Sequence, residues 1–267
     1  MAENRRVFMK LNNRVAIVTG SGRGIGRVIA HRLAQDGAYV VIASRSRENS
    51  ELVSAEIRSM GMKSLPVICD VSDENSVIMM VEAVASLYGR IDILVNNVGI
   101  RGPIANVADM DLGGWQETIA TNLTGTMLCS REVLREMIPK GTGAIVNISS
   151  DLGRRGYPSR SAYICTKWAQ IALTQTMAQE VAEFGIRVNC VCPGTVEGKR
   201  IDDLVEAQSR RLGVTGESYR KKLEASAAMK RLVTADEVAE AVLFLVCDEA
   251  SAITGQSLNV CGGTVFN

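Results

Sequence analysis

Histidine is almost absent from this chain, because His31 is the only one among its 267 residues. A Ser-His-Asp arrangement uses histidine as its general base. His31 lies early in a stretch of helical period, where a packing or surface role is expected. The sequence therefore argues against a hydrolase that depends on such a triad.

A disulfide framework and a metal-binding spacing are also missing. The seven cysteines are scattered along the chain, and no two of them form a C-x-x-C pair. Cys190-Val191-Cys192 comes nearest to a metal pair, but it lies in an apolar, strand-like run without a nearby histidine. We expect reduced thiols in cores and strands, and no metal site.

Neither sign of charge is in excess, since 30 Lys and Arg stand against 29 Asp and Glu, for a net charge of +1. Nucleic acids and anionic membranes bind a concentrated basic excess. No apolar run reaches the roughly 18 to 20 residues that cross a bilayer, and the first residues lack the apolar stretch of a secretory signal. We expect a cytoplasmic protein that binds neither nucleic acid nor membrane.

Short apolar runs alternate with longer stretches of helical period from Arg14 onward. Parallel strands joined by crossover helices have this pattern, and near-continuous apolar runs are typical of strands covered on both faces. The predicted strands are Val15–Thr19, Tyr39–Ala43, Ser64–Cys69, Ile91–Val95, Ala144–Ile148, Arg187–Val191 and Ser257–Val260. The sequence therefore predicts an α/β fold with a doubly wound, parallel, seven-stranded sheet and helices on both faces.

The predicted helices lie between these strands. They are Gly24–Asp36, Glu48–Met60, Asp73–Tyr88, Leu112–Met137, Ala162–Phe184 and Ala235–Asp248. Glycines stand just past five of them, where a left-handed C-terminal residue is favoured: Gly37, Gly61, Gly89, Gly141 and Gly185. We expect an N-terminal extension at 1–10 and a single domain at 11–267, in which the polar, amphipathic segment at about 197–230 forms a lid.

A glycine-rich segment, TGSGRGIG, stands where the first predicted strand turns into a helix. Glycine permits a tight turn and a close approach of the backbone to a pyrophosphate, which lies at the positive end of the following helix. Gly20, Gly24 and Gly26 read T-G-x-x-x-G-x-G, with Ser21, Arg23 and Ile25 between them. The segment indicates a dinucleotide-binding loop, and a plain strand-to-helix turn is the alternative.

Further short motifs follow in order: Asn96-Asn97-Val98-Gly99, Asn122 within TNLTG, Ser150, Tyr163-Ile164-Cys165-Thr166-Lys167 and Pro193-Gly194. Together with the glycine spacing they resemble the short-chain dehydrogenase/reductase family, from about Leu11 to the C-terminus. The resemblance implies a Rossmann fold and a nicotinamide-dependent oxidoreductase, with 3-oxoacyl-carrier-protein reductases as the best-populated analogue. It also implies a homotetramer built on the helices Leu112–Met137 and Ala162–Phe184 together with C-terminal contacts.

Tyr163 and Lys167 are spaced so that a helix projects them from one face. A free tyrosine has a pKa of about 10, and an adjacent ammonium stabilises the phenolate that proton transfer requires. The resemblance implies that Tyr163 exchanges the proton, that Lys167 also binds the nicotinamide ribose, and that Ser150 holds the substrate oxygen. It further implies that Asn122 places a relay water near Lys167. A solvated helix face is the alternative for Tyr-x-x-x-Lys alone, and Ser149 is the alternative hydroxyl.

The second predicted strand runs into Ser44-Arg45 and has no acidic residue at that place. An acid there binds the ribose 2′-hydroxyl of NAD, whereas an arginine accommodates the 2′-phosphate of NADP. With Arg23 in the glycine loop as a second cation, the sequence favours NADP(H) over NAD(H). Solvation of Arg23 and Arg45 is the alternative, and Arg47 or Glu48 can alter the balance. The resemblance adds further cofactor contacts: Asp70 and Val71 at the adenine, and Asn97, Gly99, Pro193, Gly194, Thr195 and Val196 elsewhere.

Several cations border the expected mouth of the site: Arg101, Arg154, Arg155, Lys199 and Arg200. Guanidinium groups recognise carboxylate, phosphate and sulfonate by paired hydrogen bonds. We therefore hypothesise a carbonyl or secondary alcohol that is anionic or carried as a thioester. Surface solvation or oligomer contacts are the alternative, since Asp151, Glu197 and Asp202 can neutralise some of these charges. A different function left open is an NADP(H)-binding sensor without turnover, and an epimerase or dehydratase relative is a third.

Overall fold

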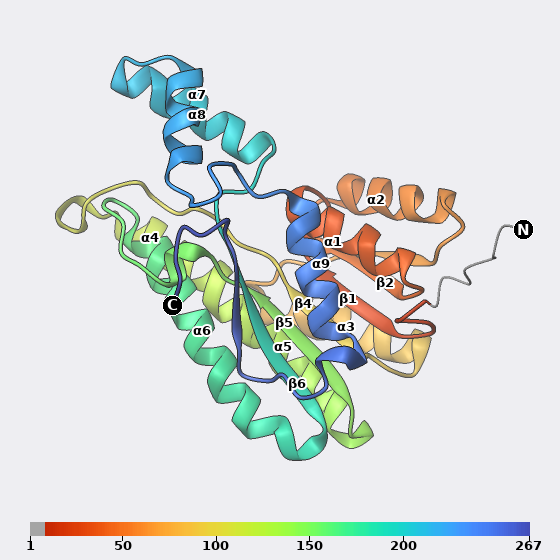
Figure 1. The fold of residues 1–267 in the computed structure, drawn as a ribbon. Coiled ribbons are helices and arrows are strands. Elements are labelled where there is room, and N and C mark those ends of the chain that lie inside the picture. Colours follow the sequence, from red (N-terminus) through yellow and green to blue (C-terminus); the bar gives the residue numbers. More distant parts are fainter. Residues whose placement is uncertain (1–8) are drawn as a thin grey trace, which may run out of the picture.

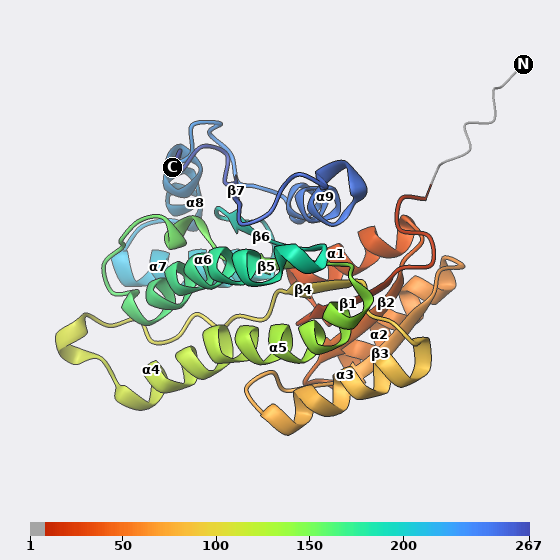
Figure 2. The same ribbon diagram turned by 90° about the horizontal axis from the view of Figure 1, so that it is seen from below.

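The computed structural model describes residues 9–267, in which a parallel sheet lies between two layers of helices (Figures 1 and 2). The strand order is β3-β2-β1-β4-β5-β6-β7, and each neighbouring pair is parallel. The strands are β1 Val15–Thr19, β2 Tyr39–Ser44, β3 Ser64–Ile68, β4 Ile93–Asn96, β5 Gly143–Ile148, β6 Ile186–Pro193 and β7 Ser257–Val260. The predicted doubly wound fold is confirmed.

The helices are α1 Gly24–Gln35, α2 Arg47–Ser59, α3 Glu74–Tyr88, α4 Leu112–Ile119, α5 Gly125–Met137, α6 Ser161–Val181, α7 Lys199–Leu212, α8 Gly216–Ala225 and α9 Ala235–Val246. Their ends follow the glycine pattern of the sequence. The five glycines expected in the left-handed region have φ between 66° and 94°.

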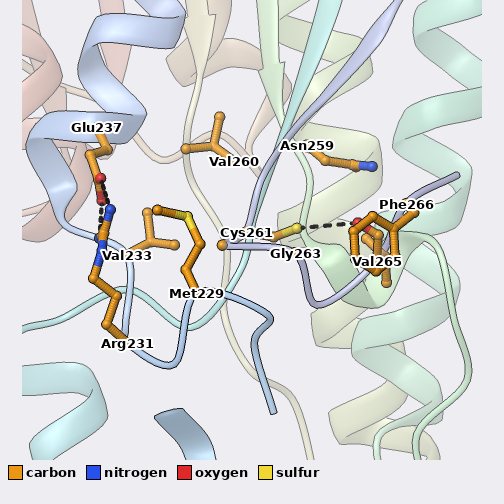
Figure 3. A pocket seen from close by; sticks show the side chains of 11 residues that line it. Met229, Arg231, Val233, Glu237, Asn259, Val260, Cys261, Gly263, Val265 and Phe266 are labelled. Carbon is orange, nitrogen blue, oxygen red and sulfur yellow. Dashed lines mark hydrogen bonds and ion pairs between the residues drawn. The ribbon is translucent and has the colours of Figure 1, made fainter. Parts of the chain in front are cut away.

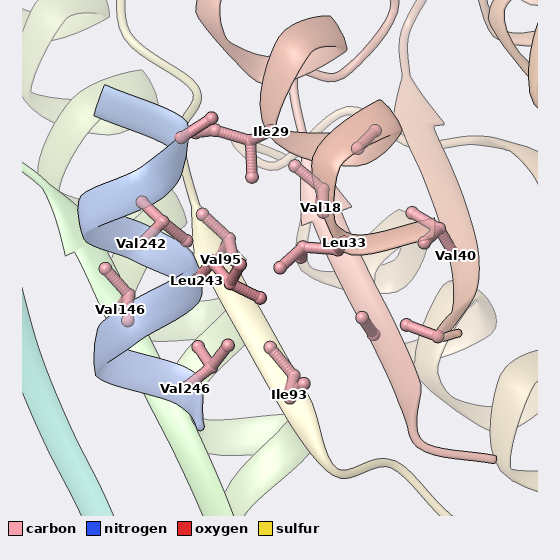
Figure 4. Close-up of a cluster of buried hydrophobic side chains, with 14 of the residues drawn as sticks. Val18, Ile29, Leu33, Val40, Ile93, Val95, Val146, Val242, Leu243 and Val246 are labelled. Carbon is pink, nitrogen blue, oxygen red and sulfur yellow. The ribbon is translucent and has the colours of Figure 1, made fainter. Parts of the chain in front are cut away.

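Two buried apolar clusters hold the helices to opposite faces of the sheet. Side chains alternate between the faces of a strand, and β1 contributes to both clusters. Ala16 and Val18 pack with α1 and α9 on one face, which Figure 4 shows from close by. Val15 and Ile17 pack with α3, α5 and α6 on the other. Both faces of the central strands are therefore buried, which explains why these strands are continuous apolar runs in the sequence.

The prediction of one continuous helix over Leu112–Met137 is wrong. A π-helical turn at Ala120–Thr124 divides it into α4 and α5, which still run nearly in line (Figure 2). A π-turn inserts one residue into the helical repeat, and apolar periodicity does not report such an insertion when both flanking helices keep the same buried side. The other elements differ from their predicted bounds by at most two residues, apart from the last turn of α6, which is a 3₁₀ turn at Ala182–Phe184.

The segment predicted as a lid contains α7 and α8, which project away from the sheet (Figure 1). It follows β6, so it begins at the carboxyl edge of the sheet. Closure of this segment over a ligand stays a prediction. Of the predicted extension at 1–10, residues 1–8 lie outside the described residues, whereas Leu11 is fully buried in the core. Within residues 9–267, no helix has the length and apolar character to cross a membrane.

Candidate active site

The predicted site residues gather at the carboxyl ends of the strands. β1, β4 and β5 end at Thr19, Asn96 and Ile148, and all point in one direction, so the segments that follow them share one edge of the sheet. The strand order reverses between β1 and β4, which are neighbours. Open α/β sheets bind ligands in the crevice at such a reversal.

The glycine loop is supported by the segment after β4 through Asn97. Asn97 Nδ2 donates to the main-chain oxygens of Thr19 and Gly20 at 3.0 and 3.2 Å. A Cβ on Gly26 would lie 2.4 Å from the same Nδ2, so no side chain fits at that position. Gly20 and Gly24 have φ of 66° and 58°, a region that favours glycine. Asn97 thus supports the loop, while its own contact with a cofactor stays a prediction.

The N-terminus of α1 has the properties that a pyrophosphate requires. Arg23 is the N-cap residue and its side chain makes no capping hydrogen bond; the first turn holds no acidic residue. A Cβ added to Gly24 would meet no atom within 4 Å, so space is open in front of the helix. The first N–H groups of a helix lack internal partners and bind anions. Ser21 is buried with its hydroxyl donating to Val18 O at 2.6 Å, and Ile25 packs against the core.

The loop also touches the end of β2, where the cofactor preference was predicted. A Cβ on Gly22 would lie 2.9 Å from Ser44 Oγ. The next residues along the two segments are Arg23 and Arg45, so the fold brings two predicted phosphate-binding cations to one region. Arg45 is 64% exposed and lies 3.9 Å from Asp70. An exposed pair at that distance is weak, and Arg45 is therefore free to bind an anion.

Asp70 and Val71 follow β3 and differ in what they can contact. Asp70 Oδ1 accepts from Ser72 N at 3.0 Å and from Ser72 Oγ at 2.6 Å. Burial would raise the pKa of Asp70, but the hydrogen bonds from Ser72 and the charge of Arg45 more than offset it and lower the pKa. Val71 is buried against α5, since a Cβ on Gly125 would meet Val71 Cγ2 at 2.7 Å. The Val71 side chain belongs to the core.

Tyr163 and Lys167 lie on one face of α6. Lys167 Nζ is 5.6 Å from the centroid of the Tyr163 ring. The ammonium donates to Ile148 O at 2.7 Å and to Gln170 Oε1 at 2.8 Å. Burial lowers the pKa of Lys167 to about 7. A strongly shifted lysine beside a tyrosine in a crevice is characteristic of a proton-transfer site.

The two serines that follow β5 have different contacts. Ser149 Oγ donates to the main-chain oxygen of Lys167 at 2.8 Å, which ties β5 to α6. Ser150 Oγ donates to Asp151 Oδ1 at 3.1 Å and accepts from Leu152 N at 3.2 Å. The bond of Ser150 to its neighbour can be exchanged by rotation of the hydroxyl, whereas that of Ser149 joins two elements. Ser150 therefore stays the better candidate for holding a substrate oxygen.

Asn122 lies in the π-helical turn and is fully buried. Its Oδ1 accepts from Ile100 N at 2.8 Å and its Nδ2 donates to Ile100 O at 3.0 Å. A Cβ on Gly99 would lie 3.4 Å from Lys167 Nζ and 3.7 Å from Asn122 Oδ1. The turn thus brings Asn122 and Gly99 to the Lys167 ammonium, and π-turns are frequent at functional sites. The relay role of Asn122 stays a prediction.

The predicted cofactor contacts Pro193, Gly194, Thr195 and Val196 follow one another at the end of β6. The main chain on either side of Val196 is bonded to Val233, with Val233 N donating to Thr195 O at 3.0 Å and Glu197 N donating to Val233 O at 2.8 Å. A Cβ on Gly194 would lie 2.8 Å from Cys261 Cα, so the C-terminal segment packs closely here. These residues border the crevice on its C-terminal side, and their contacts with a cofactor stay predictions.

Three arginines gather beside Tyr163. Arg160 Cζ lies 5.9 Å from the centroid of the Tyr163 ring, and Arg101 Nη2 donates to Arg200 O. Burial lowers the pKa of both Arg101 and Arg160, and the charge of Arg200 lowers both further. Arg160 Nη1 is buried and has no hydrogen-bond partner among the described residues. The result is a local excess of positive charge next to the candidate catalytic tyrosine.

The remaining predicted cations already have partners. Arg155 Nη2 donates to Asp151 Oδ2 at 2.9 Å, and Arg154 Nη2 donates to Ser257 O at 3.0 Å. Lys199 Nζ pairs with Asp203 at 3.1 Å on the exposed side of α7. The cations beside Tyr163 are therefore Arg101 and Arg200, which were predicted, and Arg160, which was not.

Two residues at the site escaped the sequence-based reasoning. Arg160 precedes Tyr163 by three positions and Gln170 follows Lys167 by three. Gln170 lies on the same side of α6 as the Tyr-Lys pair, so helical periodicity was an available signal for it. Arg160 is the N-cap residue that precedes α6 and has a non-helical backbone, so periodicity did not indicate its place. Polarity was a second signal for Gln170, which is fully buried.

A hollow of about 470 Å³ lies elsewhere, beside the C-terminal segment (Figure 3). Its walls include Met229, Cys261 and Phe266, and an ion pair between Arg231 and Glu237 stands on one side. None of the candidate catalytic side chains lines it. Within residues 9–267, no group of three or more His, Cys, Asp or Glu is placed to hold a metal ion, and the seven cysteines are free.

The fold and the crevice together define a class, the dinucleotide-dependent oxidoreductases. Comparison with known proteins then gives the family. A family model described as enoyl-(acyl carrier protein) reductase matches residues 20–265. The chain belongs to the short-chain dehydrogenase/reductase family.

The relatives support an oxidoreductase rather than the sensor that the sequence left open. Cis-4-hydroxycyclohexanecarboxylate dehydrogenase of Sinomonas cyclohexanicum is 38% identical over 94% of this chain and 96% of its own length. A 3-oxoacyl-[acyl-carrier-protein] reductase of Staphylococcus epidermidis is 35% identical over 94% and 98%. Both are named as dehydrogenases or reductases, which confirms the predicted enzyme class and the resemblance to oxoacyl reductases.

Two solved structures share the fold closely. NAD⁺-bound xylitol dehydrogenase has a TM-score of 0.91 and 34% identity, covering 95% of this chain and 100% of its own. A variant of actinorhodin polyketide ketoreductase with NADPH has a TM-score of 0.90 and 36% identity, covering 94% and 97%. The first of these two structures therefore contains NAD⁺, and the second contains NADPH.

Proposed function

We propose that this chain transfers a hydride between NADP(H) and the carbonyl or secondary alcohol of a small anionic molecule. The observation that carries the proposal is the buried Lys167 ammonium, 5.6 Å from the centroid of the Tyr163 ring. Bound nicotinamide supplies or accepts the hydride. The proton and the orientation of the substrate are then the tasks of the chain's own residues.

In the direction of reduction, Tyr163 donates its proton to the substrate oxygen while hydride reaches the carbonyl carbon, so an alcohol forms; oxidation is the reverse. Ser150 turns its hydroxyl from Asp151 toward the substrate oxygen and stabilises the charge that develops there. Lys167 stabilises the phenolate that remains on Tyr163 and binds the nicotinamide ribose. Each step uses a residue at the carboxyl edge of the sheet.

NADP(H) is the cofactor that the residues after β2 favour. Ser44 and Arg45 stand where NAD-dependent relatives of this fold carry an acid, and Arg23 adds a second cation close by. The NADPH-bound ketoreductase and the oxoacyl reductase among the relatives support this choice. The pyrophosphate is bound by the uncapped N-terminus of α1.

An anionic substrate is favoured by the arginines beside Tyr163. Arg101, Arg160 and Arg200 repel one another, and a carboxylate or phosphate bound among them would remove that repulsion by charge-assisted hydrogen bonds. The hydroxycyclohexanecarboxylate named for one relative carries a carboxylate of this kind. The homotetramer and the cytoplasmic location expected from the sequence stay predictions.

The proposal is tested by following NADPH absorbance over a panel of ketones, 3-oxoacyl thioesters and sugars, in which each keto acid is paired with its methyl ester. We expect Tyr163→Phe to lower kcat at least ~100-fold, the scale of general acid catalysis. Free acids should exceed their esters in kcat/KM, and Arg160→Leu should remove that difference.

Activity near wild type in Tyr163→Phe would overturn the mechanism. Equal kcat/KM for acids and esters would remove the anionic substrate and leave hydride transfer intact. Binding of NADPH without turnover of any member of the panel would instead favour the sensor.

A further inference from the structure

Gln170 is a fully buried polar residue on the face of α6 that carries Tyr163 and Lys167. A side-chain amide has two donor hydrogens and an acceptor oxygen. Burying these groups unpaired costs more free energy than the bonds themselves contribute. The presence of an amide in this dry part of the fold therefore calls for specific partners.

The amide joins Lys167 to Asn122. Lys167 Nζ donates to Gln170 Oε1 at 2.8 Å, and Gln170 Nε2 donates to the main-chain oxygen of Asn122 at 2.8 Å. Nε2 also donates to Thr126 Oγ1 at 2.8 Å, and that hydroxyl donates to the same Asn122 oxygen at 2.8 Å. An ammonium can only donate and a carbonyl can only accept, so the amide bridges them in one orientation. Each hydrogen bond of the Gln170 amide thus pairs a donor with an acceptor.

We propose that Gln170 is a positioning residue that stands in place of the relay water expected between Lys167 and Asn122. Its amide oxygen is the second acceptor for the Lys167 ammonium, beside Ile148 O at 2.7 Å. Its amide nitrogen anchors that oxygen to the π-helical turn through Asn122. The inference rests on the proposed function, because it concerns the lysine that supports proton transfer at Tyr163.

The charge on Lys167 depends on this bridge. The pKa of Lys167 is lowered to about 7, chiefly by burial and to a smaller extent by the charge of Arg200 on α7, while Cys190 and Cys192 on β6 oppose this shift. Tyr163 on the same helix is the other titratable group that faces the ammonium. Hydrogen bonds to the charged form favour it. Removal of the Gln170 oxygen should therefore make Lys167 lose its proton at a lower pH.

Two variants separate hydrogen bonding from packing. Gln170→Met keeps the length and bulk of the side chain but offers no comparable acceptor. Gln170→Ala leaves a space lined by Lys167 Nζ, Asn122 O and Thr126 Oγ1, and a polar space of this kind admits water. If hydrogen bonding matters, Met is the more damaging; if packing matters, Ala is, because cavities cost stability and volume-conserving exchanges do not.

The measurement is the titration of Lys167 by NMR of protein labelled with ¹³C-lysine, with the signal assigned by its loss in Lys167→Met. We expect the titration of Lys167 to move to lower pH in Gln170→Met, and to move less in Gln170→Ala. The kcat of Gln170→Met should fall roughly tenfold, the effect of losing one hydrogen bond to a charged group. The upper limb of its pH profile should move down with the lysine.

Gln170→Glu is a third variant that keeps shape and acceptor and adds a negative charge, so it should move the Lys167 titration to higher pH. An unchanged titration in both Gln170→Met and Gln170→Glu, or a larger loss of kcat in Ala than in Met, would overturn the role of Gln170. If the lysine titrations follow the expected order while the wild type turns over no substrate, the proposed function fails and the role of Gln170 stands.

Discussion

Arg45 is the residue on which the proposed choice of cofactor chiefly depends. It follows β2 directly, its side chain is 64% exposed, and its nearest carboxylate is Asp70 at 3.9 Å. The contact between Gly22 and Ser44 brings the glycine loop to the same region. A guanidinium so loosely paired loses little when it turns toward a 2′-phosphate.

Replacing Arg45 by alanine should therefore weaken NADPH and leave NADH nearly unchanged. Since a hydrogen bond to a charged group contributes about 1.5–3 kcal/mol, KM for NADPH should rise roughly tenfold or more. Steady-state kinetics with both cofactors measures the effect. Arg58→Ala is the matched control, because Arg58 is an exposed arginine near the other end of α2 that donates to Ser54 Oγ. An equal rise in KM for NADH would contradict the assignment.

At the scale of elements, the start of α9 is held by reciprocal capping bonds. Thr234 Oγ1 accepts from Glu237 N at 3.2 Å, and Thr234 N donates to Glu237 Oε2 at 2.8 Å. Hydrogen bonds from Arg231 and from the backbone of Thr234 lower the pKa of Glu237 to about 2. α9 packs on α1 and β5 in one of the two apolar clusters, so this cap anchors a helix that covers the sheet.

Glu237→Gln should lower Tm at pH 7 by about 1–2 °C, since an exposed ion pair contributes about 0.5 kcal/mol. A carboxylate whose folded pKa is depressed stabilises the fold above its unfolded pKa, near 4.5, and loses that contribution as pH falls toward 2. The Tm values of the wild type and of Glu237→Gln should therefore converge at acidic pH. Asp236→Asn, at an exposed acid in the same turn, is the control; a Tm difference that persists undiminished at pH 2 would contradict the account.

For the whole molecule, the outward sides of the long helices carry exposed apolar side chains. Leu112 on α4, Met127 on α5 and Trp168 on α6 are all exposed, the last at 48%. The three helices neighbour one another in the layer seen in Figure 2. Exposed apolar groups of this size on one layer are typical of surfaces that a second chain covers.

Light scattering after gel filtration should accordingly give four times the chain mass of 28.7 kDa. Trp168→Glu should reduce the measured mass, because a charge at a covered apolar position is costly. Leu52→Glu, at an exposed leucine on α2, should leave it unchanged. A mass of one chain for the wild type, or dissociation by Leu52→Glu, would exclude the proposed assembly.

Local pattern accounts for most of the fold and for part of the site. Continuous apolar runs identified the central strands because β1 and its neighbours in the middle of the sheet are buried on both faces. The edge strands β3 and β7 are only half-buried. The glycines just past the helices predicted where those helices end, because a left-handed backbone conformation is sterically favourable only for glycine. The spacing of Tyr163 and Lys167 puts them on one helix face wherever that helix packs.

Tertiary structure decided which side chains meet across the crevice. The π-turn that holds Asn122 interrupts a regular helical period. The bond from Arg154 to Ser257 O and the burial of Val71 against Gly125 join segments that are distant in sequence. Periodicity within one element carries no information on such partners. The sequence by itself therefore determined the strands, the loop and the Tyr-Lys pair, whereas only the packing of the π-helical turn on α6 decided that Gln170 joins Lys167 to Asn122.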